Sequence, residues 1–300
     1  MILSMLAGFT TVPSVAAGKS YRLKGRGRME EEVLRRLMGQ LMPKVTTQLR
    51  SAMANMHFAS AALAPEDQRT ADPELDRKAA YLDQSYYQLL RLVNNLALAD
   101  LLTSQRELAL RDRDLADLVR EACLRAESLA ALKGLELEFR CPRESHICAF
   151  DRDTVEQLLF QLLSNAFKFT PAGGKITVKL DFTPGTVLLS VSDTGEGIPP
   201  EKLATLFAPQ PEMDAASLLP PHGVGVGLLL CHQIARAHSG RVMAAPRPGG
   251  GTTVTFSMPD RKTGFTAVDD VPFDYAGGFD RTLLCLADAL PVGAFTVAER

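Results

Sequence analysis

The sequence lacks several features that mark common classes of protein. Its five cysteines are odd in number and none forms a CxxC pair, so we expect buried free thiols in a reducing compartment rather than disulfides or a zinc site. The net charge of −2 gives no overall attraction to nucleic acid. No run reaches the roughly 18 uncharged apolar residues that a membrane-spanning helix needs. The overall composition, 46% hydrophobic and 23% charged, is that of an ordinary globular protein. The length of 300 residues predicts one or two domains.

The first 28 residues differ from the rest of the chain in composition. Residues 1–17 are apolar, but hydroxyl side chains and a proline interrupt them, and the stretch lacks the basic start of a secretory signal. Lysine and arginine then recur up to Arg28 without an acidic residue, which fits either a basic segment beside a membrane or a solvated lead-in. We expect residues 1–28 to be a flexible basic lead-in of a cytoplasmic protein, without membrane contact.

Two long helical patterns follow, within residues 29–104. Apolar residues recur at spacings of three and four from Glu30 to Leu63 and again from Glu74 to Thr103, where the pattern is heptad-like. The stretch Ala64–Pro73 has a proline near each end and is predicted to be a loop. Neither helix can bury its apolar stripe against the other alone, so we expect the hairpin to pair with a second copy as a dimeric four-helix bundle.

Residues 105–260 mix helical and strand patterns. Helices are predicted from Leu115 to Lys133 and from Asp151 to about Thr170. Strands are predicted in residues 135–140, 147–150, 175–182, 186–192 and 252–258. We therefore expect an α+β chain, in which an N-terminal antiparallel helical hairpin precedes a two-layer α/β sandwich. Residues 261–300 form a C-terminal extension, and the amphipathic pattern in Phe279–Leu290 fits either an extra helix docked on the sandwich or a partner-binding tail.

The first of three ordered motifs is a helix with a polar stripe. The stretch Leu158–Thr170 reads LLFQLLSNAFKFT and places Gln161, Asn165 and Lys168 along one side of the helix. Taken alone, the stripe is either a solvated helix edge or a face turned toward something polar.

Two glycine-containing motifs follow. Asp193 ends a strand pattern and begins the run DTGEGI, whose glycines allow close backbone approach; a plain turn is the alternative. The run HGVGVG begins at His222 and precedes a helix, Leu228–Ala237, and backbone N–H groups at such a helix start can hold phosphate. We interpret His222, His232 and His238 as capping or packing residues rather than as metal ligands.

Together the three motifs resemble the ATP-binding domain of sensor histidine kinases, in the wider GHKL ATPase family, over Leu115–Pro259. The resemblance implies ATP and Mg²⁺ as cofactors, and a mobile lid in residues 208–221. Asn165 is expected to hold Mg²⁺, Lys168 to lie near the phosphates, and Asp193 to accept a hydrogen bond from the adenine amino group. The other residues at matching positions, expected to bind ATP, are Gly195, Gly197, Ile198, Gly223, Gly225, Gly227, Leu228 and Thr252.

The hairpin departs from this family at the phosphoryl acceptor. The family's acceptor box commonly reads His-Glu-Leu-Arg-Thr-Pro-Leu, and the best match here is TQLRSAM, in which Thr47 replaces the histidine and Gln48 the acid. Histidine offers a neutral nitrogen nucleophile near pH 7, whereas a threonine hydroxyl needs a general base, which an amide does not provide. His57 is interpreted as a surface or bundle residue, with a displaced acceptor as the alternative.

We therefore expect an ATP-binding, histidine kinase-like protein of two-component phosphorelay signalling, impaired in autophosphorylation because Thr47 replaces the acceptor. Two alternatives remain: an ATP-gated pseudokinase that regulates a partner, and a GHKL kinase that phosphorylates a partner protein in trans. A homodimer through the hairpin is expected, with a response regulator or a partner kinase as a further partner and no nucleic acid.

Overall fold

The computed structural model describes residues 39, 41–103, 108–199, 226–265 and 279–297. The expected basic lead-in and the expected lid lie outside the described residues. The chain divides into two units, Met1–Val45 and Thr46–Arg300, and the described residues of the first unit are helical. No helix of the described residues is both long and apolar enough to cross a membrane.

Three helices open the second unit: residues 46–63, α2 (Glu66–Ala71) and α3 (Pro73–Thr103). The short α2 stands where the sequence predicts a loop, so that prediction is wrong. Pro65 precedes α2 and Pro73 begins α3, positions at which the missing N–H of proline costs no helical hydrogen bond. Acidic residues in the first turn of both helices interact favourably with the helix dipole. The prolines therefore begin helices here instead of bounding a loop.

Helix 46–63 and α3 run antiparallel. Arg50 donates a hydrogen bond to Asn94 over 2.7 Å, and the rings of His57 and Tyr86 stack at 4.5 Å. Residue numbers thus rise along one helix as they fall along the other, which gives the expected hairpin.

Seven strands are found in the described residues: β1 (Arg111–Asp114), β2 (Glu136–Arg140), β3 (Ile147–Phe150), β4 (Lys175–Thr183), β5 (Thr186–Asp193), β6 (Arg241–Pro246) and β7 (Thr252–Pro259). Five of them form a mixed sheet in the order β2-β4-β5-β7-β6, in which β2 and β4 are parallel and the other neighbours antiparallel. The antiparallel pair β1–β3 forms a second, small sheet.

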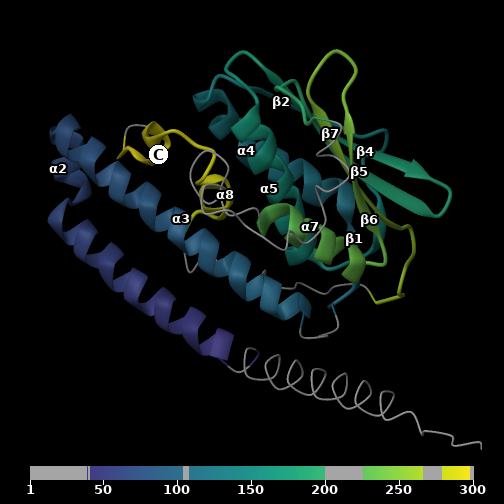
Figure 1. The fold of residues 1–300 in the computed structure, drawn as a ribbon, viewed down its shortest axis with the longest axis horizontal. Coiled ribbons are helices and arrows are strands. Elements are labelled where there is room, and N and C mark those ends of the chain that lie inside the picture. The colour runs from purple at the N-terminus through teal and green to yellow at the C-terminus, as the bar shows by residue number, and fades with distance from the viewer. Residues whose placement is uncertain (1–38, 40, 104–107, 200–225, 266–278, 298–300) are drawn as a thin grey trace, which may run out of the picture. The chain divides into compact units, whose positions relative to one another are not determined.

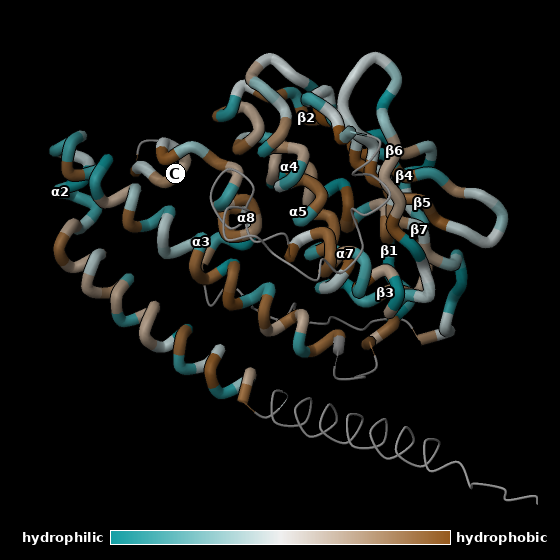
Figure 2. Tube along the Cα trace, viewed as in Figure 1, coloured by the Kyte–Doolittle hydropathy of each residue, from teal (hydrophilic) through white to brown (hydrophobic). Residues whose placement is uncertain are grey.

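Helices α4 (Leu115–Leu132), α5 (Arg152–Phe169) and α7 (Val226–Ala237) cover one face of the larger sheet (Figure 1). Asp114 and Asp151 begin α4 and α5, because each side chain accepts the N–H three residues later. Side chains of β5 alternate between buried and half-buried, as expected for a strand with one face on the core. Figure 2 shows hydrophobic residues concentrated in the helices against the sheet, whereas α2 is hydrophilic. This architecture confirms the α+β prediction with a two-layer sandwich.

Strands β1 and β6 have no counterpart in the prediction. β1 reads RDRD and has no apolar alternation. Its Asp112 accepts backbone hydrogen bonds from Thr263 and Gly264, over 2.7 and 2.9 Å, which is a pairing across 151 residues that a local pattern does not reveal. β6 lies at an edge of the sheet and ends in a proline, which an edge strand tolerates.

The end of the described chain forms α8 (Arg281–Leu286) and a short 3₁₀ helix, η2 (Val292–Phe295). Asp280 begins α8 by accepting the N–H of Leu283 over 2.7 Å. The apolar side chains of α8 are buried, and the helix contacts both α5 and α3. Of the two interpretations of this stretch, a helix docked on the sandwich is confirmed.

Candidate functional site

The loop after β5 is organised by one carboxylate oxygen. Oδ1 of Asp193 accepts hydrogen bonds from the backbone nitrogens of Gly195, over 2.9 Å, and of Thr252, over 3.2 Å. Within the described residues, Oδ2 makes no hydrogen bond. The Asp193 side chain is largely buried, so its second oxygen is an acceptor held in a fixed direction.

Two glycines allow the loops of this site to approach other backbone closely. A Cβ on Gly195 would collide with the carbonyl oxygen of Phe169, at the end of α5. A Cβ on Gly251 would collide with the carbonyl oxygen of Asp193, and the φ of Gly251 is +95°, which a side chain disfavours. These contacts bring the ends of α5, β5 and the β6–β7 connection together. The close backbone approach predicted for Gly195 is therefore present, and Gly251 makes a second one.

The remaining residues expected at the site lie around this loop where the structure describes them. Gly197 has a φ of +77° and faces the backbone of Gly251. Ile198 and Leu228 are half-buried, and Thr252 is buried at the start of β7. Gly223 and Gly225 lie outside the described residues.

Asn165 presents its amide at the half-exposed side of α5. Within the described part of the chain, this amide makes no hydrogen bond. An amide oxygen is a hard ligand of the kind that Mg²⁺ prefers, together with phosphate oxygens and water. The donor type and the exposure of Asn165 both fit an Mg²⁺ site shared with phosphate.

Gln161, at the N-terminal end of the predicted stripe, faces α3 instead. Its Oε1 accepts a hydrogen bond from Arg91 over 2.9 Å, and its Nε2 donates to Asn95 over 2.8 Å. Arg91 also donates to Ser164 over 2.9 Å, and all four side chains are buried. A Cβ on Gly227, near the start of α7, would lie 2.9 Å from the same Gln161 oxygen. The three residues of the predicted stripe therefore do not act together: Gln161 joins the sandwich to the hairpin.

Lys168 ends the stripe and already has an acidic partner. Its Nζ lies 3.3 Å from Oδ2 of Asp288, which follows α8. The same oxygen lies 3.3 Å from Nη1 of Arg91. Burial lowers the pKa of the Lys168 ammonium, Asp288 opposes that shift, and the charge of Arg91 adds to it. Sequence patterns did not indicate this role of Asp288, because 120 residues separate it from Lys168.

The side chains at the acceptor position are exposed on the hairpin. Thr47 and Gln48 both have exposed side chains. His57 instead packs between aromatic rings, stacked on Tyr86 and edge-on to Phe279, whose ring centre is 4.8 Å away. This packing agrees with the interpretation of His57 as a bundle residue.

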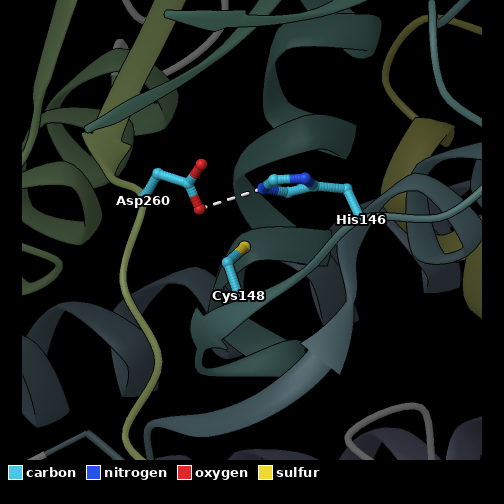
Figure 3. A group of neighbouring side chains, drawn as sticks. All are labelled: His146, Cys148 and Asp260. Carbon is cyan, nitrogen blue, oxygen red and sulfur yellow. Dashed lines mark hydrogen bonds and ion pairs between the residues drawn. The ribbon is translucent and has the colours of Figure 1, made fainter. Parts of the chain in front are cut away.

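A cluster of possible metal ligands lies away from this site (Figure 3). Ligand atoms of His146, Cys148 and Asp260 are within 4.8 Å of one another. His146 Nε2 lies 3.0 Å from Asp260 and Nδ1 lies 2.8 Å from Arg143, so both ring nitrogens already have protein partners. Burial, with nearby carboxylates, raises the pKa of Cys148 to about 12 and keeps the thiol protonated. The hydrogen bond between His146, just before β3, and Asp260, just after β7, therefore gives the cluster a structural role.

His238 is also structural, as predicted. Its Nδ1 contacts the carbonyl oxygen of Ile234 at 2.9 Å, and Nε2 accepts the backbone N–H of Asp151 over 3.2 Å. The ring thereby ties the end of α7 to the start of α5.

Comparisons with known proteins agree with this arrangement. Residues 150–262 match the family described as histidine kinase-, DNA gyrase B-, and HSP90-like ATPase. The chain is 32% identical over 241 residues to the histidine protein kinase DivJ of Caulobacter vibrioides, which covers 78% of this chain and 39% of DivJ. It is 30% identical over 241 residues to the adaptive-response sensory kinase SasA of Synechocystis sp., which covers 77% of this chain and 62% of SasA. The chain thus spans about two fifths to three fifths of the length of these two relatives.

A solved structure shows the same fold. Full-length ShkA, crystallised in complex with AMPPNP, matches 75% of this chain and 46% of its own with a TM-score of 0.60. The sequence identity is 24%, so this likeness concerns the fold. The ordered motifs, the mixed sheet with its helical layer and the matching relatives all confirm the resemblance: residues 150–262 belong to the GHKL, or histidine kinase-like, ATPase family, and the chain is related to sensor histidine kinases.

Proposed function

We propose that this protein binds Mg-ATP and acts in two-component signalling through nucleotide-dependent contacts, with its own autophosphorylation impaired. The observation that carries the proposal is the Asp193 carboxylate. One oxygen fixes the loop through two backbone hydrogen bonds, and the other is left as an acceptor. Such an acceptor suits the amino group of adenine, which only donates there.

Phosphate and metal have suitable partners on α5. Asn165 would supply an amide oxygen to Mg²⁺, which neutralises charge on the phosphates when it is bound. Lys168 lies one helical turn further along and would contribute a positive charge. The predicted glycine-rich stretch before α7 would add backbone N–H groups at a helix start.

Autophosphorylation lacks a nucleophile of the family's kind. Thr47 and Gln48 are exposed, and a threonine hydroxyl needs a general base, which the amide of Gln48 does not provide. The ring of His57 is packed against Tyr86 and Phe279, which opposes a role as a displaced acceptor. Phosphoryl transfer needs a positioned nucleophile as well as a bound nucleotide.

The exposed face of the hairpin supports a homodimer. Three leucines of α3, Leu82, Leu89 and Leu96, recur every seven residues and are exposed, as are Leu49, Met56 and Leu63 of the facing helix. The alternate α3 residues Ala79, Tyr86 and Val93 are buried against the rest of the chain. The pattern leaves one apolar stripe per helix for a second copy to cover.

The contact between α3 and α5 favours one specific alternative, an ATP-gated pseudokinase that regulates a partner. Arg91 and Asn95 of the hairpin bind Gln161 directly, one turn from Asn165. A nucleotide at Asn165 would therefore lie next to a polar contact with the hairpin, and hairpin position is a natural signal to a partner such as a response regulator.

Two parallel measurements distinguish ATP binding from phosphoryl transfer. Purified protein is incubated with Mg²⁺ and γ-labelled ATP, and binding is followed in parallel by thermal shift, with Asp193→Asn as the control. We expect a thermal shift in the wild type only, without retained label. Absence of any Asp193-dependent shift would contradict the proposed nucleotide site.

A further inference from the structure

Residues 279–297 bind the hairpin by several independent contacts. Arg69 of α2 donates to the carbonyl oxygen of Phe295 over 2.9 Å, and its other nitrogens pair with Asp76 and Asp83 of α3. Gln84 donates to the carbonyl oxygen of Leu290 over 2.9 Å. The rings of Phe279 and Phe295 pack on Tyr87 of α3, with centres 5.7 and 5.5 Å away. The segment is thus fixed to α3 along several turns.

The same segment binds the sandwich. Arg281 lies 3.3 Å from Asp153 and 3.2 Å from Glu156, both on α5. Cys285 contacts Gln157 of the same helix at 3.6 Å, and the apolar side chains of α8 are buried. In Figure 1, α8 lies between α3 and α5. One short segment therefore fastens the hairpin to the helix that carries the proposed nucleotide ligands.

Asp288 is the charged centre of this attachment. One of its oxygens lies 3.3 Å from Lys168 of α5 and 3.3 Å from Arg91 of α3. The Lys168 side chain is only 12% exposed, so a second anion has little room to reach the ammonium while Asp288 stays in place. A carboxylate thus holds the cation that a nucleotide phosphate would need.

We propose that residues 279–297 are an autoinhibitory C-terminal clamp, and that ATP and Asp288 compete for Lys168. This proposal rests on the proposed function, because it takes Lys168 as a phosphate ligand. Binding of ATP draws Lys168 away from Asp288, and the loss of that ion pair weakens the hold of α8 between α5 and α3. Conversely, removal of the clamp should increase the affinity for ATP.

The first test compares the Kd of Mg-ATP at pH 7 for the full chain and for Asp288→Asn, which keeps the size of the side chain and removes its charge. A clamp that is closed about nine tenths of the time raises the apparent Kd about tenfold, so the variant should bind about tenfold more tightly. Asp181→Asn is the matched control, because it removes the same charge from an exposed ion pair on β4. In a chain that already carries Lys168→Met, adding Asp288→Asn should leave the Kd of Mg-ATP unchanged. Equal affinities of wild type and Asp288→Asn would overturn the proposal.

The second test needs no substitution and covers the case in which Asp288→Asn fails to fold. Hydrogen exchange of the wild type is measured with and without saturating Mg-ATP. We expect faster exchange in the peptides that contain α8 and η2 when ATP is bound. Unchanged or slower exchange there, with ATP bound, would overturn the clamp and leave the nucleotide site intact. Failure of every variant and the wild type to bind ATP would instead contradict the proposed function.

Discussion

Oδ1 of Asp193 lies 3.2 Å from the backbone nitrogen of Thr252, and this hydrogen bond joins the end of β5 to the start of β7. The same oxygen accepts the N–H of Gly195, so it organises the loop on both sides. Oδ2 makes no hydrogen bond within the described residues. The structural role and the proposed adenine contact of Asp193 therefore belong to different atoms.

Two substitutions at Asp193 should separate these roles. Asp193→Asn can keep an oxygen at the Oδ1 position and turns Oδ2 into a donor, so we expect ATP affinity to fall about 10- to 100-fold with little change in stability. Asp193→Ala removes both acceptors and should also cost about 1–3 kcal/mol of unfolding free energy. Calorimetric titration with Mg-ATP and urea unfolding measure the two effects. An Asn variant that binds ATP as tightly as the wild type would contradict the adenine contact.

Gly195→Ala should damage the site through its shape. The new Cβ would collide with the carbonyl oxygen of Phe169, and backbone cannot move away as a side chain can. We expect a loss of about 1–3 kcal/mol of stability, together with weaker ATP binding. Gly39→Ala is the control, because residue 39 is helical and exposed, with open space around it. Equal stabilities of the two variants would show that the loop tolerates a side chain.

His238 should make stability depend on pH. Burial lowers the pKa of His238 from its ordinary value of 6.5, and Nε2 accepts an N–H that a protonated ring could not accept. Between the folded and unfolded pKa values only the unfolded chain binds the proton. Stability should therefore fall as pH drops below about 6.5, until the folded pKa is passed. Urea unfolding at several pH values tests this: between pH 8 and pH 5, the unfolding free energy of His238→Gln should fall less than that of the wild type. Parallel plots of unfolding free energy against pH for the two proteins would contradict this account.

Leu89→Glu should separate the proposed dimer. Leu89 is exposed in the middle of the α3 stripe, and a buried carboxylate at the bundle seam would oppose association. We expect a monomer by light scattering at concentrations at which the wild type is dimeric, with near-normal helix content. Leu124→Glu introduces the same charge at an exposed leucine of α4, outside the hairpin, and should leave the dimer unchanged. A monomeric wild type would contradict the dimer.

Much of the candidate site could be proposed from the sequence because its residues lie in three compact motifs. Asp193, Gly195 and Asn165 each sit within a local pattern that also fixes a strand end or a helix. The helices α4 and α5 follow from local apolar spacing, and the glycine-rich run from His222 indicated the helix that corresponds to α7.

Contacts between distant segments could not be predicted. Gln161 looked like part of one polar stripe, yet Arg91 and Asn95 draw it toward α3 across about 70 residues. Asp288 meets Lys168 only because α8 folds back between two helices. The helix α2 was missed because a proline can begin a helix as well as end one.

The central claim is that the protein binds ATP but is impaired in autophosphorylation, because Thr47 replaces the acceptor histidine. The most direct test incubates the wild type, Asp193→Asn, and a chain with Thr47→His and Gln48→Glu together with Mg²⁺ and γ-labelled ATP. We predict Asp193-dependent ATP binding without retained label in the wild type, and acid-labile label in the chain with the restored acceptor pair. Acid-labile label on the wild type, at a level that depends on Asp193, would contradict the account.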